Sequence, residues 1–220
     1  NAVIKTSIVH ADETGFRING INNWLHVACS ANLTHYGVTE GRGYDSMNEI
    51  GILQNIQGKM VHDCYPSYFR FDVDHILCNP HFIRELVFSE EQLNQKWAKK
   101  MKELLEEVYS WHRGEERLIK KFHRQYREII KLGYEETSPP PIPKIKKRGR
   151  IAKSKERNLL ERMDKYSDNI TWFLESPDIP FSNNQAEQDV RMMKVKQKIS
   201  GGFRTKEGAN VFARIRSYIS

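Results

Sequence analysis

The first forty residues constrain the fold most, because they predict three consecutive strands joined by short turns. Residues 3–12, VIKTSIVHAD, are rich in β-branched side chains, and NWLHVACSA and LTHYGVT follow the pair Asn19-Gly20. Asn-Gly between two β-rich segments is the strongest short-range signal for a two-residue hairpin. The segment therefore predicts an antiparallel meander of three strands.

A helix and two further strands follow this meander in the predicted order. GYDSMNEIGILQNI predicts a helix capped by Asp45 or Ser46, and GKMVHD and DHILCN predict the fourth and fifth strands. PHFIRELVF predicts another helix, with Pro80 in its first turn. The order β-β-β-α-β-β-α predicts an α/β protein with a mixed sheet.

The second half of the chain has the pattern of helices. From about Ser89 the apolar residues recur at helical spacing, and Gly114 is expected to divide this stretch into an antiparallel helical hairpin. The apolar stripe that this spacing predicts consists of Trp97, Met101, Leu104, Leu105 and Val108. TSPPPIPKIKKRGRIAKSKER then predicts an extended linker. The remainder predicts three helices, the last two of which are joined by a Gly-Gly turn.

Bulk properties limit the class of protein. No stretch approaches the roughly 20 apolar residues of a membrane span, and the first residues, NAVIKTSIV, do not resemble a secretory leader. The three cysteines have no framework spacing, so we expect reduced thiols in a cytosolic-type protein. A net charge of +7 favours polyanionic partners.

Two acids stand at the predicted ends of neighbouring strands. Asp12 is expected to end the first strand and Asp63 the fourth, at the sheet edge where α/β folds place ligands. Adjacent carboxylates repel each other unless a divalent cation lies between them, and an oxygen-rich site suits Mg²⁺ or Mn²⁺. The alternative is that each acid only initiates a turn.

Glu187 is the candidate for a third acid of this site. It occurs in SNNQAEQDVR, at the start of a predicted helix. One stripe of that helix is mostly apolar, and the adjacent stripe begins with Glu187 and continues with Arg191, Lys194 and Lys198. The alternative is a capping box, with Asn184 as N-cap and Glu187 three residues later.

The end of the chain is strongly basic. Residues 191–220 contain eight Lys or Arg and one acid, Glu207, so this segment carries a charge equal to the +7 of the whole chain. Clustered cations are what binding to a phosphate backbone requires. The alternative is a basic tail that serves only solubility.

Five blocks of the sequence together resemble a known family. They are HADETGFRINGINNWLHVACSANLTHYGV, GILQNIQGKMVHDCYPSY, HILCNPHFIREL, WAKKMKELL and PFSNNQAEQDVRMMKVKQKISGGFRTKEGANVFARIRSYIS. In this order they resemble the catalytic domain of bacterial insertion-sequence transposases of the insertion sequence sixty-six family. The resemblance implies an RNase H-like mixed sheet with a β-β-β-α-β-β-α core and an all-helical insertion before the last catalytic helix.

The resemblance also implies an activity and a metal site. Asp12, Asp63 and Glu187 would form a DDE triad that holds two Mg²⁺ or Mn²⁺ ions for DNA strand cleavage and strand transfer. Two alternatives remain open: a nuclease that uses the same two-metal site, and a catalytically silent DNA-binding fragment of a transposase.

Four parts of the chain follow from this resemblance and from the predicted elements. Residues 1–88 would form the first part of the RNase H-like core and residues 89–137 the helical insertion. Residues 138–158 would be a Pro-rich and basic linker, and residues 159–220 would complete the core and end in a DNA-binding tail. Because nothing here corresponds to the N-terminal DNA-recognition parts of the family, and the sequence stops after RSYIS, we expect a catalytic core or an incomplete element.

The implied partners are the DNA of the element ends and of the target. Homodimers or larger oligomers on DNA, and a place in the bacterial cytoplasm at the nucleoid, are family expectations. No membrane is implied. The residues expected to contact DNA are Arg191, Lys194, Lys198, Arg204, Lys147 and Arg148.

Cysteine and histidine residues after Asp63 present a further choice. Cys64, His75, Cys78 and His81 have the spacing C-x10-H-x2-C-x2-H, which differs from the paired ligands of zinc fingers. A C-x2-H pair after the second acid occurs in several DDE transposase families, so the resemblance implies that Cys78 and His81 support the carboxylates from behind. A zinc site formed by the four residues is the alternative. His62 is expected to point to the face of the strand opposite Asp63.

Overall fold

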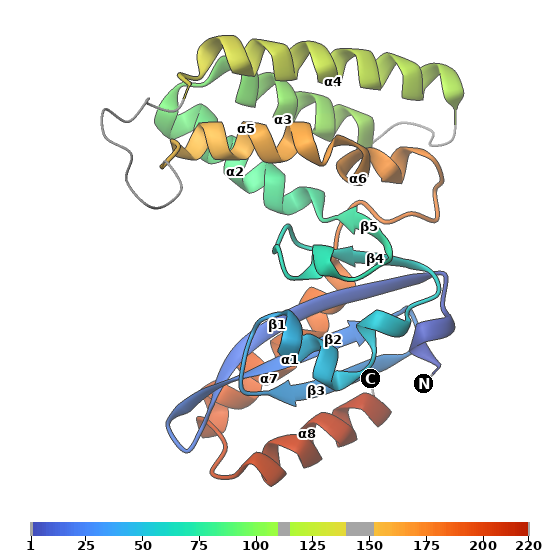
Figure 1. Cartoon of the computed structure of the whole chain (residues 1–220), viewed down its shortest axis with the longest axis vertical. Helices are drawn as coiled ribbons and strands as arrows, with labels where there is room; N and C mark the ends of the chain where they lie inside the picture. The colour runs from blue at the N-terminus through green and yellow to red at the C-terminus, as the bar shows by residue number, and fades with distance from the viewer. Residues whose placement is uncertain (1, 110–114, 140–151, 220) are drawn as a thin grey trace. The chain divides into compact units, whose positions relative to one another are not determined.

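The computed structural model describes residues 2–109, 115–139 and 152–219, and Figure 1 shows their course. The chain divides into two compact units, which are described separately. Residues 1–78 and 182–220 form the sheet-containing unit, and residues 79–181 form the helical unit. The predicted break at Gly114 and the candidate DNA contacts Lys147 and Arg148 lie outside the described residues.

A five-stranded mixed sheet forms the centre of the first unit, which confirms the predicted α/β class. The strands are β1 (Ile8–Ile18), β2 (Ile21–Cys29), β3 (Thr34–Thr39), β4 (Lys59–His62) and β5 (Asp74–Leu77). Their order is β3-β2-β1-β4-β5. The β1–β2 and β2–β3 pairs are antiparallel, whereas the β1–β4 and β4–β5 pairs are parallel.

The predicted hairpin turn is confirmed at Asn19-Gly20. Both residues have positive φ, 47° at Asn19 and 78° at Gly20. Two successive residues in this region form the type of turn whose twist matches that of the flanking strands. The first strand, however, begins at Ile8 and runs to Ile18, because Val3–Lys5 forms a 3-10 turn.

Helices cover both faces of this sheet. On one face α1 (Tyr44–Ile50) buries Met47 against Val9, Ala11 and Met60. On the other face, α7 (Asn184–Ser200) and α8 (Lys206–Ile219) pack small and apolar side chains against the strands, and in Figure 1 α7 runs behind the sheet. The side chains at the centre of that second core are Phe16, Leu25, Val27, Ala186, Val190, Met193, Ala209 and Ala213.

The predicted cap of α1 is wrong. Gly43 occupies the N-cap position, and neither Asp45 nor Ser46 caps the helix, since both lie within its first turn. The helix ends at Gly51, whose φ of 79° is accessible to glycine without strain.

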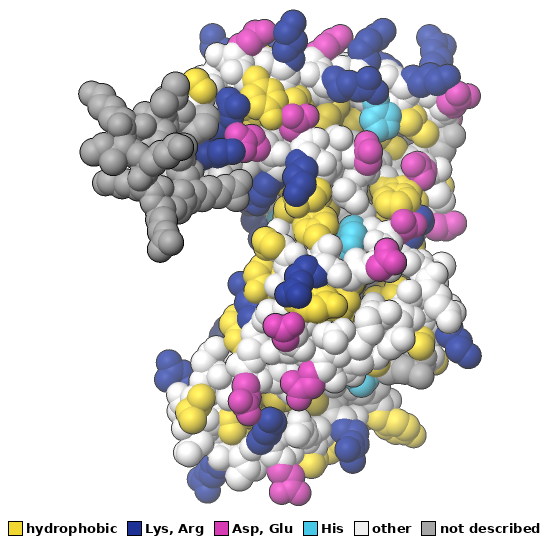
Figure 2. Space-filling view, viewed as in Figure 1, with side chains coloured by type: hydrophobic (Ala, Val, Ile, Leu, Met, Phe, Trp, Pro, Cys, Tyr) yellow, Lys and Arg dark blue, Asp and Glu magenta, His cyan; other side chains and the backbone are white. Residues whose placement is uncertain are grey.

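The helical unit contains α2 (Asn79–Leu93), α3 (Lys96–Tyr109), α4 (Glu116–Glu136), α5 (Lys155–Lys165) and α6 (Ser167–Thr171). All five side chains of the predicted stripe on α3 are buried. Phe122, Tyr126 and Ile130 form the buried stripe of α4, and Tyr126 donates a hydrogen bond to Met163 O at 2.9 Å. The outer side of α4 mixes basic and acidic side chains, as a solvated helix face does (Figure 2).

The boundaries of the units differ from the expected ones. The helical unit includes residues 79–88 and 159–181, which the sequence analysis assigned to the core. Asn79 explains this, because its N–H donates to Phe181 O at 3.1 Å and its Nδ2 donates to Ile170 O at 3.0 Å. The beginning and the end of the unit are thereby joined. None of the described helices has the length and apolar character needed to cross a membrane.

Gly58 controls the approach of β4 to β1. A Cβ atom at this position would lie 2.3 Å from Ser7 O and 2.4 Å from Thr6 O, and both are backbone atoms that cannot rotate away. The next residue, Lys59, donates the hydrogen bond to Ser7 O, 2.9 Å long, that begins the parallel pairing. We expect Gly58→Ala to lower the free energy of unfolding by about 1–3 kcal/mol, measured by urea denaturation.

Gly208→Ala is the matched control for this prediction. Its Cβ would lie 3.3 Å from Thr205 Oγ1, a side-chain atom that can move. Because Gly208 lies in α8, we expect its unfolding free energy to stay within about 1 kcal/mol of the wild-type value. Equal urea midpoints for wild type and Gly58→Ala would contradict the prediction.

Candidate active site

Asp12 and Asp63 lie at the same level of the sheet. The parallel register pairs Ile8 with Lys59 and His10 with Val61, so its continuation by two residues brings Asp12 opposite Asp63. The prediction that Asp12 ends its strand is wrong, because β1 continues to Ile18 through its pairing with β2. β4, by contrast, ends at His62, so on this side Asp12 lies just beyond the last residue of the neighbouring strand.

Local backbone groups orient both carboxylates. The N–H of Glu13 donates to Asp12 Oδ1 at 2.8 Å, and the N–H of Tyr65 donates to Asp63 Oδ1 at 3.0 Å. The second bond is the side-chain-to-backbone contact of a turn that starts at an aspartate. Asp63 therefore does stabilise the turn that follows it, and this role is compatible with a second role as a ligand.

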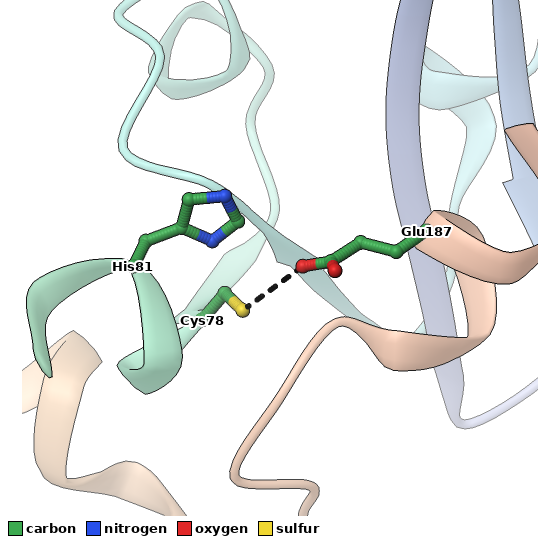
Figure 3. Close-up of side chains that lie close together, drawn as sticks. All are labelled: Cys78, His81 and Glu187. Atoms are coloured by element: carbon green, nitrogen blue, oxygen red, sulfur yellow. Dashed lines mark hydrogen bonds between the residues drawn. The ribbon is translucent and has the colours of Figure 1, made fainter. Parts of the chain in front are cut away.

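Glu187 lies in the first turn of α7, next to Ala186, which is buried in the core that α7 forms with the sheet. Cys78 Sγ donates to Glu187 Oε1 at 3.8 Å, the dashed line in Figure 3. His81, which Figure 3 also labels, lies in the first turn of α2 and so belongs to the helical unit. Cys78 therefore contacts Glu187, and the supporting roles that we expect of Cys78 and His81 stay predictions.

Asn183 makes contacts beside the candidate site that the sequence analysis missed. The alternative of a capping box at Asn184 is wrong, because Asn183 is the N-cap and its side chain makes no cap bond. Its Nδ2 donates to Ala11 O at 2.8 Å, and its Oδ1 lies 3.0 Å from His10 Nδ1. Its N–H donates to Cys78 Sγ at 3.2 Å. The start of α7 is thereby fixed to β1 one residue before Asp12.

Burial and neighbouring charge change the acidity of Asp12. Burial first, and then the nearby charges of Glu13, Asp63 and Glu187, together raise the pKa of Asp12 to about 7. Asp63 and Glu187 therefore lie within electrostatic reach of Asp12. A carboxylate whose ionisation is disfavoured in this way gains from a bound divalent cation, and Asp12, Asp63 and Glu187 could each offer oxygen ligands to Mg²⁺ or Mn²⁺.

Glu13 points to the opposite face of β1 and forms a buried network of its own. Arg42 Nε and Nη2 both contact Glu13 Oε1 at 2.7 Å, and the Tyr68 hydroxyl donates to Glu13 Oε2. The Glu13 side chain is 1% exposed and that of Arg42 41%. The Arg42 guanidinium also lies 4.1 Å from the ring centroid of Tyr65, the residue whose N–H holds Asp63. Glu13 thus links β1 to the turn that carries Asp63.

The histidines near Asp63 do not form a zinc site with Cys64. His62 is fully buried on the Tyr68 side of the sheet, as predicted, and burial lowers its pKa to about 3. His75 contacts His62 Nε2 through Nδ1 at 2.9 Å and Phe71 O through Nε2 at 3.2 Å. Within the described ranges, neither Cys64 nor His75 belongs to a group of three metal-ligating side chains. All three cysteines are free thiols, as expected.

The basic side chains that we predicted on α7 follow Glu187, which lies in the first turn of that helix. Arg191, Lys194 and Lys198 are exposed, as is Arg204 in the turn after the helix. Lys194 Nζ donates to Gly15 O at 2.9 Å, which holds this cation over β1. Lys196 lies on another side, with Nζ 3.9 Å from the ring centroid of Phe203.

A comparison with protein families matches most of the chain, and a comparison with single proteins matches a shorter segment. A family model described as "Transposase IS66 family" matches residues 1–211. The uncharacterized protein y4jO of Sinorhizobium fredii (strain NBRC 101917 / NGR234) is 42% identical over 50 residues, which are 23% of this chain and 16% of that protein. The matched segment therefore spans about a sixth of this curated relative.

One solved structure is also similar. It is the cryo-EM structure of a simian T-cell lymphotropic virus intasome in complex with PP2A regulatory subunit B56 gamma. The similarity covers 66% of this chain and 59% of that chain, at 14% identity and a TM-score of 0.29.

The network around Glu13 predicts a stability effect at Tyr68. Tyr68→Phe removes a hydrogen bond to a buried carboxylate, so we expect the free energy of unfolding to fall by about 1.5–3 kcal/mol. Tyr134→Phe is the matched control, because the Tyr134 hydroxyl donates at 2.7 Å to Asp164 at the surface. In Tyr134→Phe we expect the free energy of unfolding to fall by less than about 1 kcal/mol. Urea denaturation that ranks the two variants the other way round would contradict the prediction.

The raised pKa of Asp12 predicts that the metal-free protein loses stability as the pH rises. The unfolded chain releases this proton near about pH 4, whereas the folded protein holds it up to about pH 7. Between these values the unfolded state binds fewer protons, so the free energy of unfolding decreases with pH. Asp12→Asn removes this loss.

We expect metal-free Asp12→Asn to be more stable than wild type at pH 8 by about 2–4 kcal/mol, and similar to it at pH 4. Urea denaturation in EDTA at both pH values measures this difference. Asp72→Asn, at an exposed position, is the control and should follow the wild-type pH dependence. If Asp12→Asn lost stability between pH 4 and pH 8 as steeply as wild type, the pKa of Asp12 would not be the cause of the pH dependence.

Proposed function

Because the chain belongs to the IS66 family of transposases, we propose that it is a DNA transposase that cleaves and joins DNA strands through Asp12, Asp63 and Glu187. The observation that carries this proposal is that Asp63 and Glu187, from distant parts of the chain, both lie within electrostatic reach of Asp12. Asp12 and Asp63 share one level of the sheet, and both Asp63 and Glu187 act on the pKa of Asp12. We further propose that the sheet, with its order β3-β2-β1-β4-β5, is of the RNase H-like type.

The three acids would hold two Mg²⁺ or Mn²⁺ ions. Carboxylate oxygens are the ligands that these cations prefer, and the charge cost of placing three acids together would be offset by the bound cations. When bound, such ions activate the attacking oxygen and stabilise the leaving oxygen in phosphoryl transfer.

The protein's own residues would keep these acids in place. The backbone N–H groups of Glu13 and Tyr65 orient Asp12 and Asp63, and Asn183 fixes the start of α7, from which Glu187 projects. Asp12 lies in a strand and Glu187 in a helix, elements that hold a site more precisely than loops do, whereas Asp63 depends on the turn after β4.

Neutral histidines near the site have structural roles in this proposal. The buried His62 has a low pKa and lies on the far face, and His10 shares a hydrogen bond with Asn183. Proton transfer by a histidine is therefore not part of the mechanism that we propose.

DNA would lie along the basic side of α7. Arg191, Lys194, Lys198 and Arg204 are exposed and follow Glu187 in the sequence, so they would contact phosphates near the reacting strand. Lys147 and Arg148 remain candidates of the same kind. Oligomers on DNA and a location in the bacterial cytoplasm also belong to this proposal.

Asp63→Asn tests the proposed activity directly. Loss of one metal ligand removes several kcal/mol of transition-state stabilisation, so we expect nicking and joining of element-end DNA in Mg²⁺ to fall by about a thousandfold or more. Asp72→Asn is the control from the same loop and should keep wild-type rates. Denaturing gels that resolve nicked from joined strands provide the measurement.

The products separate the proposed function from its two alternatives. Joined strands support a transposase, whereas cleaved ends without joining support a nuclease with the same site. A protein that binds DNA but shows neither product, and no heat of Mg²⁺ binding in calorimetry, would be a silent fragment. Wild-type rates in Asp63→Asn would contradict the triad.

A further inference from the structure

A depression of about 370 Å³ lies between α2 and α5 within the helical unit. Its lining combines two apolar side chains, Phe88 and Leu159, with three cations, Arg84, Lys155 and Arg162. The volume lies in the range of roughly 300–1,000 Å³ that is typical of small-molecule sites. The depression can therefore accept a group of the size of one nucleotide.

Phe88 is the unusual member of this lining. Its side chain is 41% exposed, whereas Phe82 and Leu86 on the same helix are 1% and 0% exposed. The ring already attracts a cation, because Lys155 Nζ lies 5.0 Å from its centroid. An exposed aromatic ring in a concave site is a surface on which a planar group can stack.

The charge around Phe88 favours an anion. Three cations and one acid, Glu85, line this depression, and Arg162 forms an ion pair with Glu85. Arg84 and Lys155 are both exposed. Hydrophobic and basic side chains also lie beside each other in the region of α2 and α5 in Figure 2.

A second depression of the same unit gives a useful contrast. It lies between α3 and α4, has a volume of about 430 Å³ and is lined by Lys100 with three acids, Glu103, Glu107 and Glu128. Its charge has the opposite sign, and its lining contains no aromatic ring. A polyanion would be repelled there, so the preference for an anion distinguishes the depression at Phe88 from a neighbouring one of similar size.

We infer that the α2–α5 depression binds an unpaired nucleotide of a DNA strand. The base stacks on Phe88, and Arg84 and Lys155 hold the adjacent phosphates. The nucleotide must be unpaired, because both faces of a base inside a duplex are already covered by its neighbours. This inference rests on the proposed function, which makes DNA the polyanion that the protein meets.

The test measures binding of a short single-stranded oligonucleotide that contains 2-aminopurine, whose fluorescence falls when it stacks on an aromatic ring. The full chain carries Asp63→Asn, and the buffer contains EDTA, so no strand is cut. We expect Phe88→Leu to weaken binding by about tenfold to a hundredfold and to abolish the stacking signal. A blunt duplex of the same sequence should bind without that signal.

Three variants serve as comparisons. Tyr218→Leu removes an aromatic ring that is 91% exposed in the other unit, and it should change neither affinity nor signal. Arg84→Gln should weaken binding and reduce the slope of log K against log salt by about 0.7. Lys100→Gln in the α3–α4 depression should leave binding unchanged. Unfolding curves in urea establish that each variant is folded.

Two results would overturn the inference: an unchanged stacking signal in Phe88→Leu, or equal loss of affinity in Phe88→Leu and Tyr218→Leu. Both are independent of the metal site. A chain that binds through Phe88 but neither nicks nor joins DNA would retain the inference and refute the proposed function. A chain that joins DNA equally well with and without Phe88, and shows no stacking, would retain the proposed function and refute the inference.

Discussion

The buried side chain of Asn183 is the interaction on which the candidate site depends. It is 1% exposed, and it joins the start of α7 to Ala11 O and to the ring of His10. A buried amide costs free energy unless its donors and acceptors are used, and here the polar groups of one side chain pair with a neighbouring strand. The other polar contacts of α7 with the sheet, such as those of Asp189 with Thr34 and of Lys194 with Gly15 O, lie further along the helix. Apolar packing is non-directional, so without Asn183 it would not specify where along β1 the helix begins.

The position of Glu187 follows from that anchor. Glu187 lies one helical turn after Asn183, so a shift of the helix start would move its carboxylate away from Asp12. The Cys78 thiol reinforces the arrangement from the end of β5, since it accepts from the N–H of Asn183 and donates to Glu187. Two strands and a helix therefore determine the place of one acid.

The sequence predicted the sheet better than it predicted the contacts around the candidate acids. Asn19-Gly20 and the apolar stripe of α3 depend on local chemistry and on periodicity, which are visible in a short window. The extent of β1 depends on its pairing with β2, and the role of Asn183 depends on which of two adjacent asparagines faces the strand. Glu13 was overlooked because its partners, Arg42 and Tyr68, come from segments that are distant in the chain. Such pairings are tertiary, and no window of sequence contains them.

The same reasoning explains how a long helical unit can interrupt the chain between Asp63 and Glu187. Lengthening a connection adds little entropic cost once its ends are held together, because that cost grows only with the logarithm of length. In the helical unit, the N–H of Asn79 donates to Phe181 O, which joins its entry to its exit. In the sheet-containing unit, the N–H of Asn183 donates to Cys78 Sγ, which joins the residues on either side of the interruption. Each unit thus closes its own ends, and the place of Glu187 is set by contacts within the sheet-containing unit rather than by the length or sequence of the helices in between.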